Sequence, residues 1–140
     1  MLGLNKRILG FAGVASIAAV SAMTMSSPQA LAACPLKIGF SMAQTGALAG
    51  GGKQALVAMK LWAEKVNKEG GLLNCPVKLV YYDDQTNAKT VPGIYAKLLD
   101  IDKVDFVVSG YGTNLIAPAM PVVIQRDMVF MGLFGMNNNK

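Results

Sequence analysis

The chain has 140 residues, enough for about one domain, and a formal net charge of +5 without a single histidine. Its lysines are scattered among acidic residues and form no basic stripe, which argues against a nucleic-acid partner. The lack of histidine excludes a serine–histidine triad, so neither Ser41 nor Ser109 has the base that a serine nucleophile of this type needs.

The first 32 residues have the pattern of a secretory signal peptide. Lys6 and Arg7 give a positive start, residues 8–23 form an uncharged apolar run, and Ala30–Ala32 supplies an A-x-A cleavage site. The run of about 16 residues is shorter than the roughly 20 that span a bilayer, which disfavours a membrane anchor. We therefore predict that residues 1–32 are removed on export to the periplasm. The remaining domain, 33–140, loses two positive charges, carries a net charge of +3 and has no membrane span.

The two cysteines stand at equivalent places in the sequence. Cys34 and Cys75 are each followed by proline, and each precedes an apolar strand-like run. If these runs are neighbouring parallel strands, about 4.7–4.9 Å apart, both cysteines lie at the same height and within disulfide range. We predict a Cys34–Cys75 disulfide, which export permits. The alternative is that Leu31–Cys34 is a lipobox and Cys34 is lipidated, which would leave Cys75 as an odd thiol.

Strand-like and helix-like patterns alternate after residue 33. Short apolar runs predict strands, and apolar residues at a period of 3.6 predict helices between them. The predicted strands cover residues 37–41, 77–82, 105–109 and 128–132, and the predicted helices cover residues 53–67, 86–99 and 114–125. Apolar strands joined by helical crossovers indicate an α/β fold with a doubly wound parallel sheet. Such a sheet normally continues past a fourth strand, so we expect this one to be truncated.

The helical segments also predict which residues are buried. Gly70–Gly71 should end the first helix, and Glu64 and Lys68 are spaced for an ion pair on its surface. Proline at 92, 118 and 121 should disturb the first turns of the other two helices. The predicted buried positions are Leu56, Met59, Ala63 and Val66 in the first helix and Ile94, Leu98 and Ile101 in the second.

Three loops follow the carboxyl ends of the first three strands, where open α/β sheets bind ligands. They begin at Ser41, Asp83 and Gly110. In the third loop, Tyr111 is suited to stack on a small solute, and backbone N–H groups at the following helix start are suited to hold a carboxylate. The alternative is plain capping by Thr113 or Asn114, with the glycines serving the turn alone.

The motifs for a nucleotide, metal or catalytic site are incomplete in this sequence. Gly52-Lys53 lacks the hydroxyl residue and the first glycine of a phosphate loop, and Leu115 replaces the third glycine of a dinucleotide motif. Asp83 and Asp84 have no histidine or further acid beside them. We therefore expect them to close the strand end and cap the following helix, and we expect no catalytic residue, metal site or cofactor.

Several segments together resemble the type I periplasmic binding proteins for branched-chain amino acids, the leucine-binding family of ABC importers. The likeness runs over nearly all of residues 33–135, and its specificity comes from the ordered set of segments. The segments that carry it are Lys37–Ser41 with Thr45-Gly46, Val66–Gly71, Val77–Asp84 and Val104–Gly110.

The resemblance implies two α/β lobes that close on a solute, with this chain supplying most of the N-terminal lobe. It implies a non-catalytic, extracytoplasmic protein that delivers branched-chain amino acids or similar small solutes to an ABC permease. The family holds the amino-acid head group from the loops after strands three and four, which here means Tyr111, Gly112, Thr113, Phe134 and Gly135. The family's serine-rich loop is replaced by Gly110–Thr113, so another amino acid, an amide or an aromatic acid remains open as the solute.

Two other functions remain compatible with the sequence. The glycine loops and Asp83-Asp84 would suit an exported Rossmann-like enzyme domain, for which cofactor binding is the test. A ligand-sensing receptor lobe of the same fold would have a kinase in place of a permease as its genomic neighbour.

Expression with residues 1–32 intact in a bacterial host should release a mature chain that begins at Ala33. The intact mass of the exported protein should equal that of residues 33–140 less two hydrogen atoms for the disulfide. A chain that begins at Cys34 and carries added acyl mass would instead establish the lipoprotein.

Overall fold

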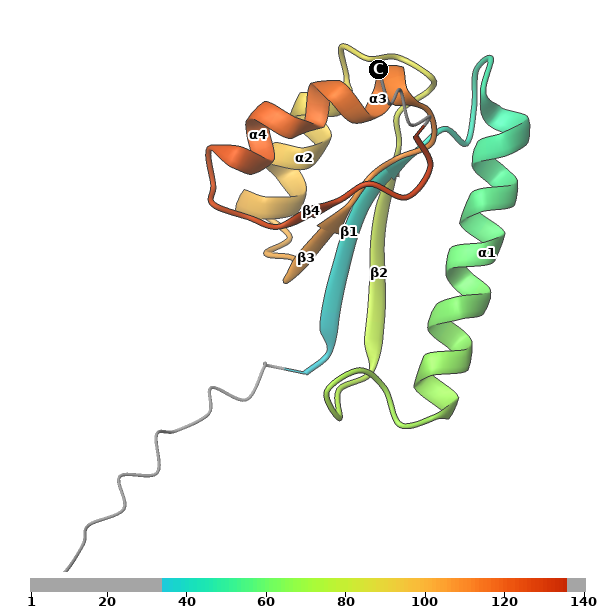
Figure 1. The fold of residues 1–140 in the computed structure, drawn as a ribbon, viewed down its shortest axis with the longest axis vertical. Helices are drawn as coiled ribbons and strands as arrows, with labels where there is room; N and C mark the ends of the chain where they lie inside the picture. Colours follow the sequence, from blue (N-terminus) through green and yellow to red (C-terminus); the bar gives the residue numbers. More distant parts are fainter. Residues whose placement is uncertain (1–33, 136–140) are drawn as a thin grey trace, which may run out of the picture. The chain divides into compact units, whose positions relative to one another are not determined.

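The computed structural model describes residues 34–135, so the predicted signal peptide lies outside the described residues. The elements are β1 (Leu36–Met42), α1 (Ala49–Lys68), β2 (Val77–Asp83), α2 (Val91–Asp100), β3 (Phe106–Val108), α3 (Thr113–Ile116), the 3-10 helix η1 (Ala117–Ala119), α4 (Met120–Ile124) and β4 (Phe130–Met131). The strands form one parallel sheet in the order β2-β1-β3-β4 (Figure 1). The predicted α/β class and parallel sheet are confirmed.

The helices cover the two faces of this sheet separately. α1 lies on one face, and α2 lies with α3 and α4 on the other (Figure 1). The side chains of β1 alternate accordingly, since Ile38 and Phe40 belong to the apolar cluster under α1 while Gly39 faces α2. A Cβ at Gly39 would lie only 2.9 Å from Val104 Cγ2, so the absent side chain lets the α2 layer approach the sheet closely.

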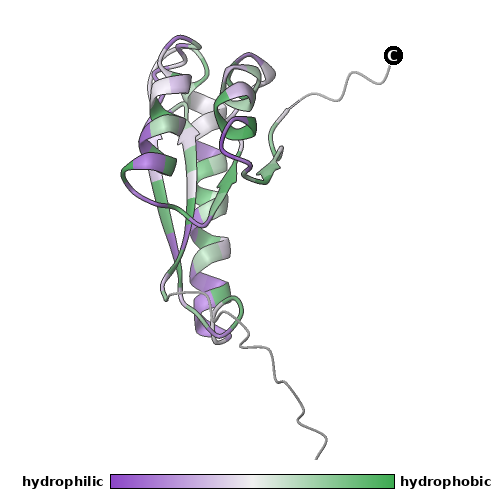
Figure 2. Cartoon of the chain, turned by 90° about the vertical axis from the view of Figure 1, so that its left-hand side faces the viewer, coloured by the Kyte–Doolittle hydropathy of each residue, from purple (hydrophilic) through white to green (hydrophobic). Residues whose placement is uncertain are grey.

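The first helix agrees with its predicted face and end. Leu56, Met59 and Ala63 are buried, and Val66 is half-buried against the same cluster. Hydrophobic and hydrophilic stretches alternate along α1 in Figure 2, as expected for a helix with one buried face. Gly70–Gly71 follows the helix with φ values of +103° and +85°, the left-handed region that ends helices. The Lys68–Glu64 ion pair forms at 2.7 Å.

The other two predicted helices differ from expectation in informative ways. α2 begins at Val91, five residues late, and Pro92 occupies its first turn, where a missing N–H costs nothing. The predicted burial of Ile101 is wrong. It lies just past the last turn and is 71% exposed, while Val91 and Tyr95 fill the buried face instead.

The third predicted helix is a series of three short pieces. α3, η1 and α4 have four, three and five residues, and Pro118 and Pro121 stand at the starts of η1 and α4. Proline cannot donate the backbone hydrogen bond of a helix interior, so each one interrupts the regular ladder. The third and fourth strands are also shorter than predicted, at three and two residues.

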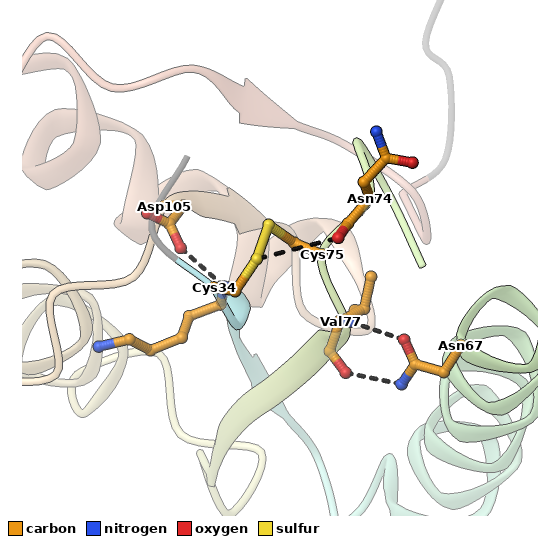
Figure 3. Close-up of a disulfide and its surroundings, with 7 residues drawn as sticks. Cys34, Asn67, Asn74, Cys75, Val77 and Asp105 are labelled. Carbon is orange, nitrogen blue, oxygen red and sulfur yellow. Dashed lines mark hydrogen bonds between the residues drawn. A yellow bond between two sulfur atoms is a disulfide. The ribbon is translucent and has the colours of Figure 1, made fainter. Parts of the chain in front are cut away.

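The amino-terminal edge of the sheet is covalently closed (Figure 3). β1 and β2 pair from Leu36 opposite Val77, which sets the preceding cysteines at the same height. Cys34 and Cys75 form a disulfide with their Cα atoms 5.1 Å apart, so the predicted pairing is confirmed. With both sulfurs paired, no described cysteine offers a free thiol.

Two side chains extend the strand pairing at this edge (Figure 3). The Asn67 amide donates to the Val77 carbonyl at 2.9 Å and accepts from the Val77 N–H at 2.6 Å, which joins α1 to β2. The Asp105 carboxylate accepts from the Lys37 N–H at 2.7 Å, just before β3 begins. Within residues 34–135 no helix combines the length and apolar character needed to cross a membrane.

Loss of the disulfide should destabilise the fold substantially. The bond closes a loop with a sequence separation of 41, and chain-entropy arguments give about 4 kcal/mol for a loop of that size. Urea unfolding of the C34A/C75A variant should show this decrease relative to the oxidised protein. A reducing agent should lower the midpoint of the wild type and leave that of the double variant unchanged. Equal midpoints for all four samples would contradict a stabilising role.

Candidate functional site

Asp83 holds two of the loops at the carboxyl edge of the sheet together. Its Oδ1 accepts backbone N–H groups from Gln44 at 3.0 Å, Thr45 at 3.2 Å and Gln85 at 2.9 Å, and its Oδ2 accepts the Thr45 hydroxyl at 2.7 Å. Partial burial raises the pKa of Asp83, but these hydrogen bonds outweigh it and hold the pKa below its ordinary value. Asp83 therefore closes the strand end as predicted. It does not cap α2, whose N-cap is Thr90.

Thr86 makes the second connection between these loops. Its hydroxyl donates to the Thr45 carbonyl at 2.8 Å and accepts the Leu48 N–H at 3.1 Å. Gly46 has φ +83°, and a Cβ there would lie 2.5 Å from the Gln85 carbonyl oxygen, so this crossing requires glycine. The loop after β1 is thus fixed at the position where α1 begins.

The Asp84 side chain, unlike that of Asp83, lies in the interior of the protein. It is fully buried, and its Oδ1 accepts the Thr86 N–H at 3.0 Å. Its Oδ2 and the Ser41 hydroxyl oxygen are both buried without a hydrogen-bond partner among the described residues, and both lie near the missing Cβ of Gly110. Burial raises the pKa of Asp84, and the neighbouring negative charge of Asp83 raises it further.

The remaining buried polar groups have structural partners. The Tyr95 hydroxyl donates to the Val108 carbonyl at 2.6 Å, and burial raises the Tyr95 pKa to about 12. The Ser109 hydroxyl accepts the Leu133 N–H at 2.8 Å and holds the segment after β4. The Tyr95 and Ser109 hydroxyls thus hold segments together at the sheet edge. The chain has no histidine that could activate Ser41 or Ser109 as a nucleophile.

The five predicted solute-binding residues line one hollow of about 540 Å³. Tyr111, Gly112 and Thr113 follow β3, and Phe134 and Gly135 follow β4. The two segments are joined by a bridge between Tyr111 and Phe134, with the Gly112 N–H donating to the Phe134 carbonyl at 3.1 Å. The structure therefore brings all five residues to one place at the carboxyl edge.

Two further residues, Leu48 and Asn114, complete the lining of this hollow. Asn114 belonged to the predicted loop, but nothing in the sequence pattern indicated Leu48, because the Asp83 and Thr86 contacts that position it join distant segments. The alternative of side-chain capping by Thr113 or Asn114 is not what the structure has, since Gly112 occupies the N-cap of α3 with φ +100°. With four residues, α3 also supplies little of the dipole expected at a long helix start.

The chemistry of the hollow is mainly apolar with a few convergent polar groups. Leu48, Tyr111 and Phe134 supply apolar surface, Thr113 and Asn114 supply a hydroxyl and an amide, and none of the described lining residues is charged. That combination fits a small solute with an apolar body and a polar head. Within residues 34–135 no three acidic, histidine or cysteine side chains cluster as a metal site would require.

A second hollow, of about 360 Å³, lies on the α1 face of the sheet near β3 and β4. Apart from the Trp62 indole, the described residues that line it are apolar, so it offers few of the side-chain groups that orient a polar solute. The first hollow is therefore the better candidate for a solute site. The second is lined by Ile38, Met59, Trp62, Leu72, Phe106, Val107, Val108, Val129, Met131 and Leu133.

Comparison with known proteins adds a family and a set of related folds. A family model described as periplasmic binding protein matches residues 35–140, whereas no curated protein sequence matches the chain significantly. The branched-chain amino acid transporter substrate-binding protein LivJ from Streptococcus pneumoniae, in complex with isoleucine, has a TM-score of 0.70 and 20% identity. The match covers 74% of this chain and 30% of that one.

Two other solved structures show the same relation. A possible leucine/isoleucine/valine-binding protein from Rhodopirellula baltica has a TM-score of 0.66 and 26% identity, over 71% of this chain and 27% of its own. A solute-binding protein of an ABC transporter from Rhodopseudomonas palustris, in complex with 3,4-dihydroxybenzoic acid, has a TM-score of 0.64 and 23% identity over the same shares. The chain thus spans less than a third of the length of these proteins.

The two neighbouring aspartates should respond oppositely to neutralisation. Asp84→Asn should raise the free energy of unfolding at neutral pH, because the asparagine keeps the Thr86 contact without a buried charge. In the wild type, the folded state keeps the Asp84 proton longer than the unfolded state does. The free energy of unfolding of the wild type should therefore decrease as the pH rises from about 4 through the raised pKa of Asp84. The Asp84→Asn variant should lack that decrease.

Asp83→Asn is the matched control. It removes a charged acceptor of four hydrogen bonds and should cost about 1 kcal/mol or more. Because the folded pKa of Asp83 is lowered, its contribution is present at neutral pH and is lost as the pH falls below about 4. Urea unfolding between about pH 2 and pH 8 covers both effects, with the Asp83 change below about pH 4 and the Asp84 change above it. The same direction of change in both variants at neutral pH would contradict the assigned environments.

Proposed function

The chain belongs to the periplasmic binding protein family, and we propose from this premise that it forms much of the N-terminal lobe of an ABC importer's extracytoplasmic solute receptor. In this role it binds a small solute without chemical conversion and presents it to a permease. The observation that carries the proposal is the single hollow that joins the residues following β3 and β4 at the carboxyl edge of the sheet.

The lining of the hollow supports a solute with a carboxylate and a compact apolar body. The Thr113 hydroxyl and the Asn114 amide can donate hydrogen bonds to a carboxylate, and Leu48 offers apolar contact. The solved relatives hold isoleucine in one case and 3,4-dihydroxybenzoic acid in another, and both molecules have these two parts. Branched-chain amino acids and related small acids therefore form the proposed class.

The site in this chain is lined from one side of the solute. The lining residues that the structure describes come from the β1–α1 loop, the β3–α3 segment and the segment after β4, all at one sheet edge. Ligand pockets normally bury most of a bound molecule's surface, and one edge alone cannot do so. In the proposed receptor a second lobe supplies the remaining cover.

Export to an oxidising compartment agrees with this role. The disulfide at the opposite edge forms and persists in the periplasm but not in the cytosol. The predicted signal peptide would deliver the chain to that compartment.

The chain by itself should bind the solute weakly and at the assigned hollow. In a ¹⁵N NMR titration, isoleucine at millimolar concentration should shift the amide signals of Tyr111, Gly112 and Asn114. The dissociation constant should be on the order of millimolar, because half of the contacts are missing. Submicromolar affinity would contradict the one-sided site, and shifts confined to other residues would contradict its location.

Asn114→Ala tests the polar contact in the same titration. Loss of one neutral hydrogen bond should weaken binding by about three- to tenfold. Gln54→Ala removes a comparable exposed amide from α1, outside the hollow, and should leave the affinity unchanged.

A further inference from the structure

The three glycines in the first turn of α1 have different surroundings. A Cβ at Gly51 would overlap the Tyr111 ring at Cζ, Oη and Cε1, and one at Gly52 would overlap the Ala43 carbonyl. A Cβ at Gly50 would meet nothing within 4 Å. Gly51 is therefore the position at which the Tyr111 ring rests directly on the helix backbone. Since glycine inside a helix costs about 1 kcal/mol relative to alanine, this close approach carries a stability cost.

Phe134 positions the Tyr111 ring from another direction. The two ring centroids are 6.2 Å apart and the rings are tilted by 38°, within the range of favourable aromatic pairs. Their backbones are also joined, through the bridge between Tyr111 and Phe134 and the adjacent Gly112 hydrogen bond. Tyr111 is thus held against α1 and paired with Phe134, while both rings still line the hollow.

This aromatic pair lies in the same hollow as the polar groups. The Thr113 hydroxyl and Asn114 amide follow Tyr111 by two and three residues, and among residues 34–135 no acidic side chain lines the hollow to receive an ammonium group. A flat aromatic ring gains edge or face contacts with Tyr111 and Phe134 that a branched aliphatic group of equal area does not. A carboxylate on that ring would reach the adjacent donors.

We propose that the Tyr111–Phe134 pair, positioned by Gly51, makes this site select an aromatic carboxylic acid over a branched aliphatic amino acid. The inference rests on the proposed function, because it names the solute class of the same hollow. Gly51 is a positioning residue here, and Tyr111 and Phe134 are the residues that contact the solute.

Three probes separate aromaticity from charge in an NMR titration of the chain. Benzoate and cyclohexanecarboxylate share a carboxylate and a six-membered ring, and isoleucine represents the aliphatic amino acids. Benzoate should bind about two- to tenfold more tightly than either of the others, with shifts at Tyr111 and Gly112. Cyclohexanecarboxylate or isoleucine binding as tightly as benzoate would overturn the inference and leave the proposed function standing. No shift at the hollow with any probe would overturn both.

Two variants with a matched control test the mechanism. Gly51→Ala should displace the Tyr111 ring and abolish the preference for benzoate over cyclohexanecarboxylate. Gly50→Ala makes the same change one residue away, where the space is open, and should keep that preference. Because Gly51→Ala also strains the fold, Phe134→Leu provides a second test that removes a ring without adding an atom to the helix. An unchanged preference in folded Gly51→Ala and Phe134→Leu proteins would overturn the inference.

Discussion

The parallel pairing of β1 with a neighbour on each side is the constraint on which this structure depends. Its seven residues pair in full register with β2, and its centre pairs with β3. Both ends of the β1–β2 pair carry a further connection, the disulfide at the amino edge and the Asp83 hydrogen bonds at the carboxyl edge. The loop that starts α1 is therefore fixed by the same pairing that forms the core, which places α1 where Tyr111 can rest against it.

The sequence predicted the parts of the fold that arise from local patterns. Alternating apolar runs and helical periods were sufficient for the parallel sheet, and the matching positions of Cys34 and Cys75 were sufficient for their pairing. The predictions from the sequence fail where contacts between distant segments determine the structure. Ile101 fits the helical period but lies past the end of α2. α1 starts at Ala49, before the predicted residue 53, and Thr86 and Asp83 form hydrogen bonds with the loop that precedes it. The third predicted helix is divided into three pieces because Pro118 and Pro121 interrupt it, and the apolar periodicity gave no sign of these interruptions.

The candidate site was predictable in its residues but not in its shape. The resemblance to the binding-protein family indicated the segments after strands three and four, and the structure brings those segments together. The contribution of Leu48 and the contact between Gly51 and Tyr111 join segments far apart in the chain, and no local pattern contains that information. The second hollow, near β3 and β4, is smaller, and apart from the Trp62 indole its described lining is apolar, so both size and lining chemistry favour the first.

The contact between Gly51 and Tyr111 also couples two positions that are 60 residues apart in the sequence. A side chain at position 51 is compatible with this backbone only if position 111 carries a residue too small to reach the helix. The two positions should therefore change together among related proteins, with glycine accompanying an aromatic residue and alanine accompanying serine or another small residue. Such covariation would arise from excluded volume alone, and it would mark a shared evolutionary step in which the wall of the site and the start of α1 were altered as one unit.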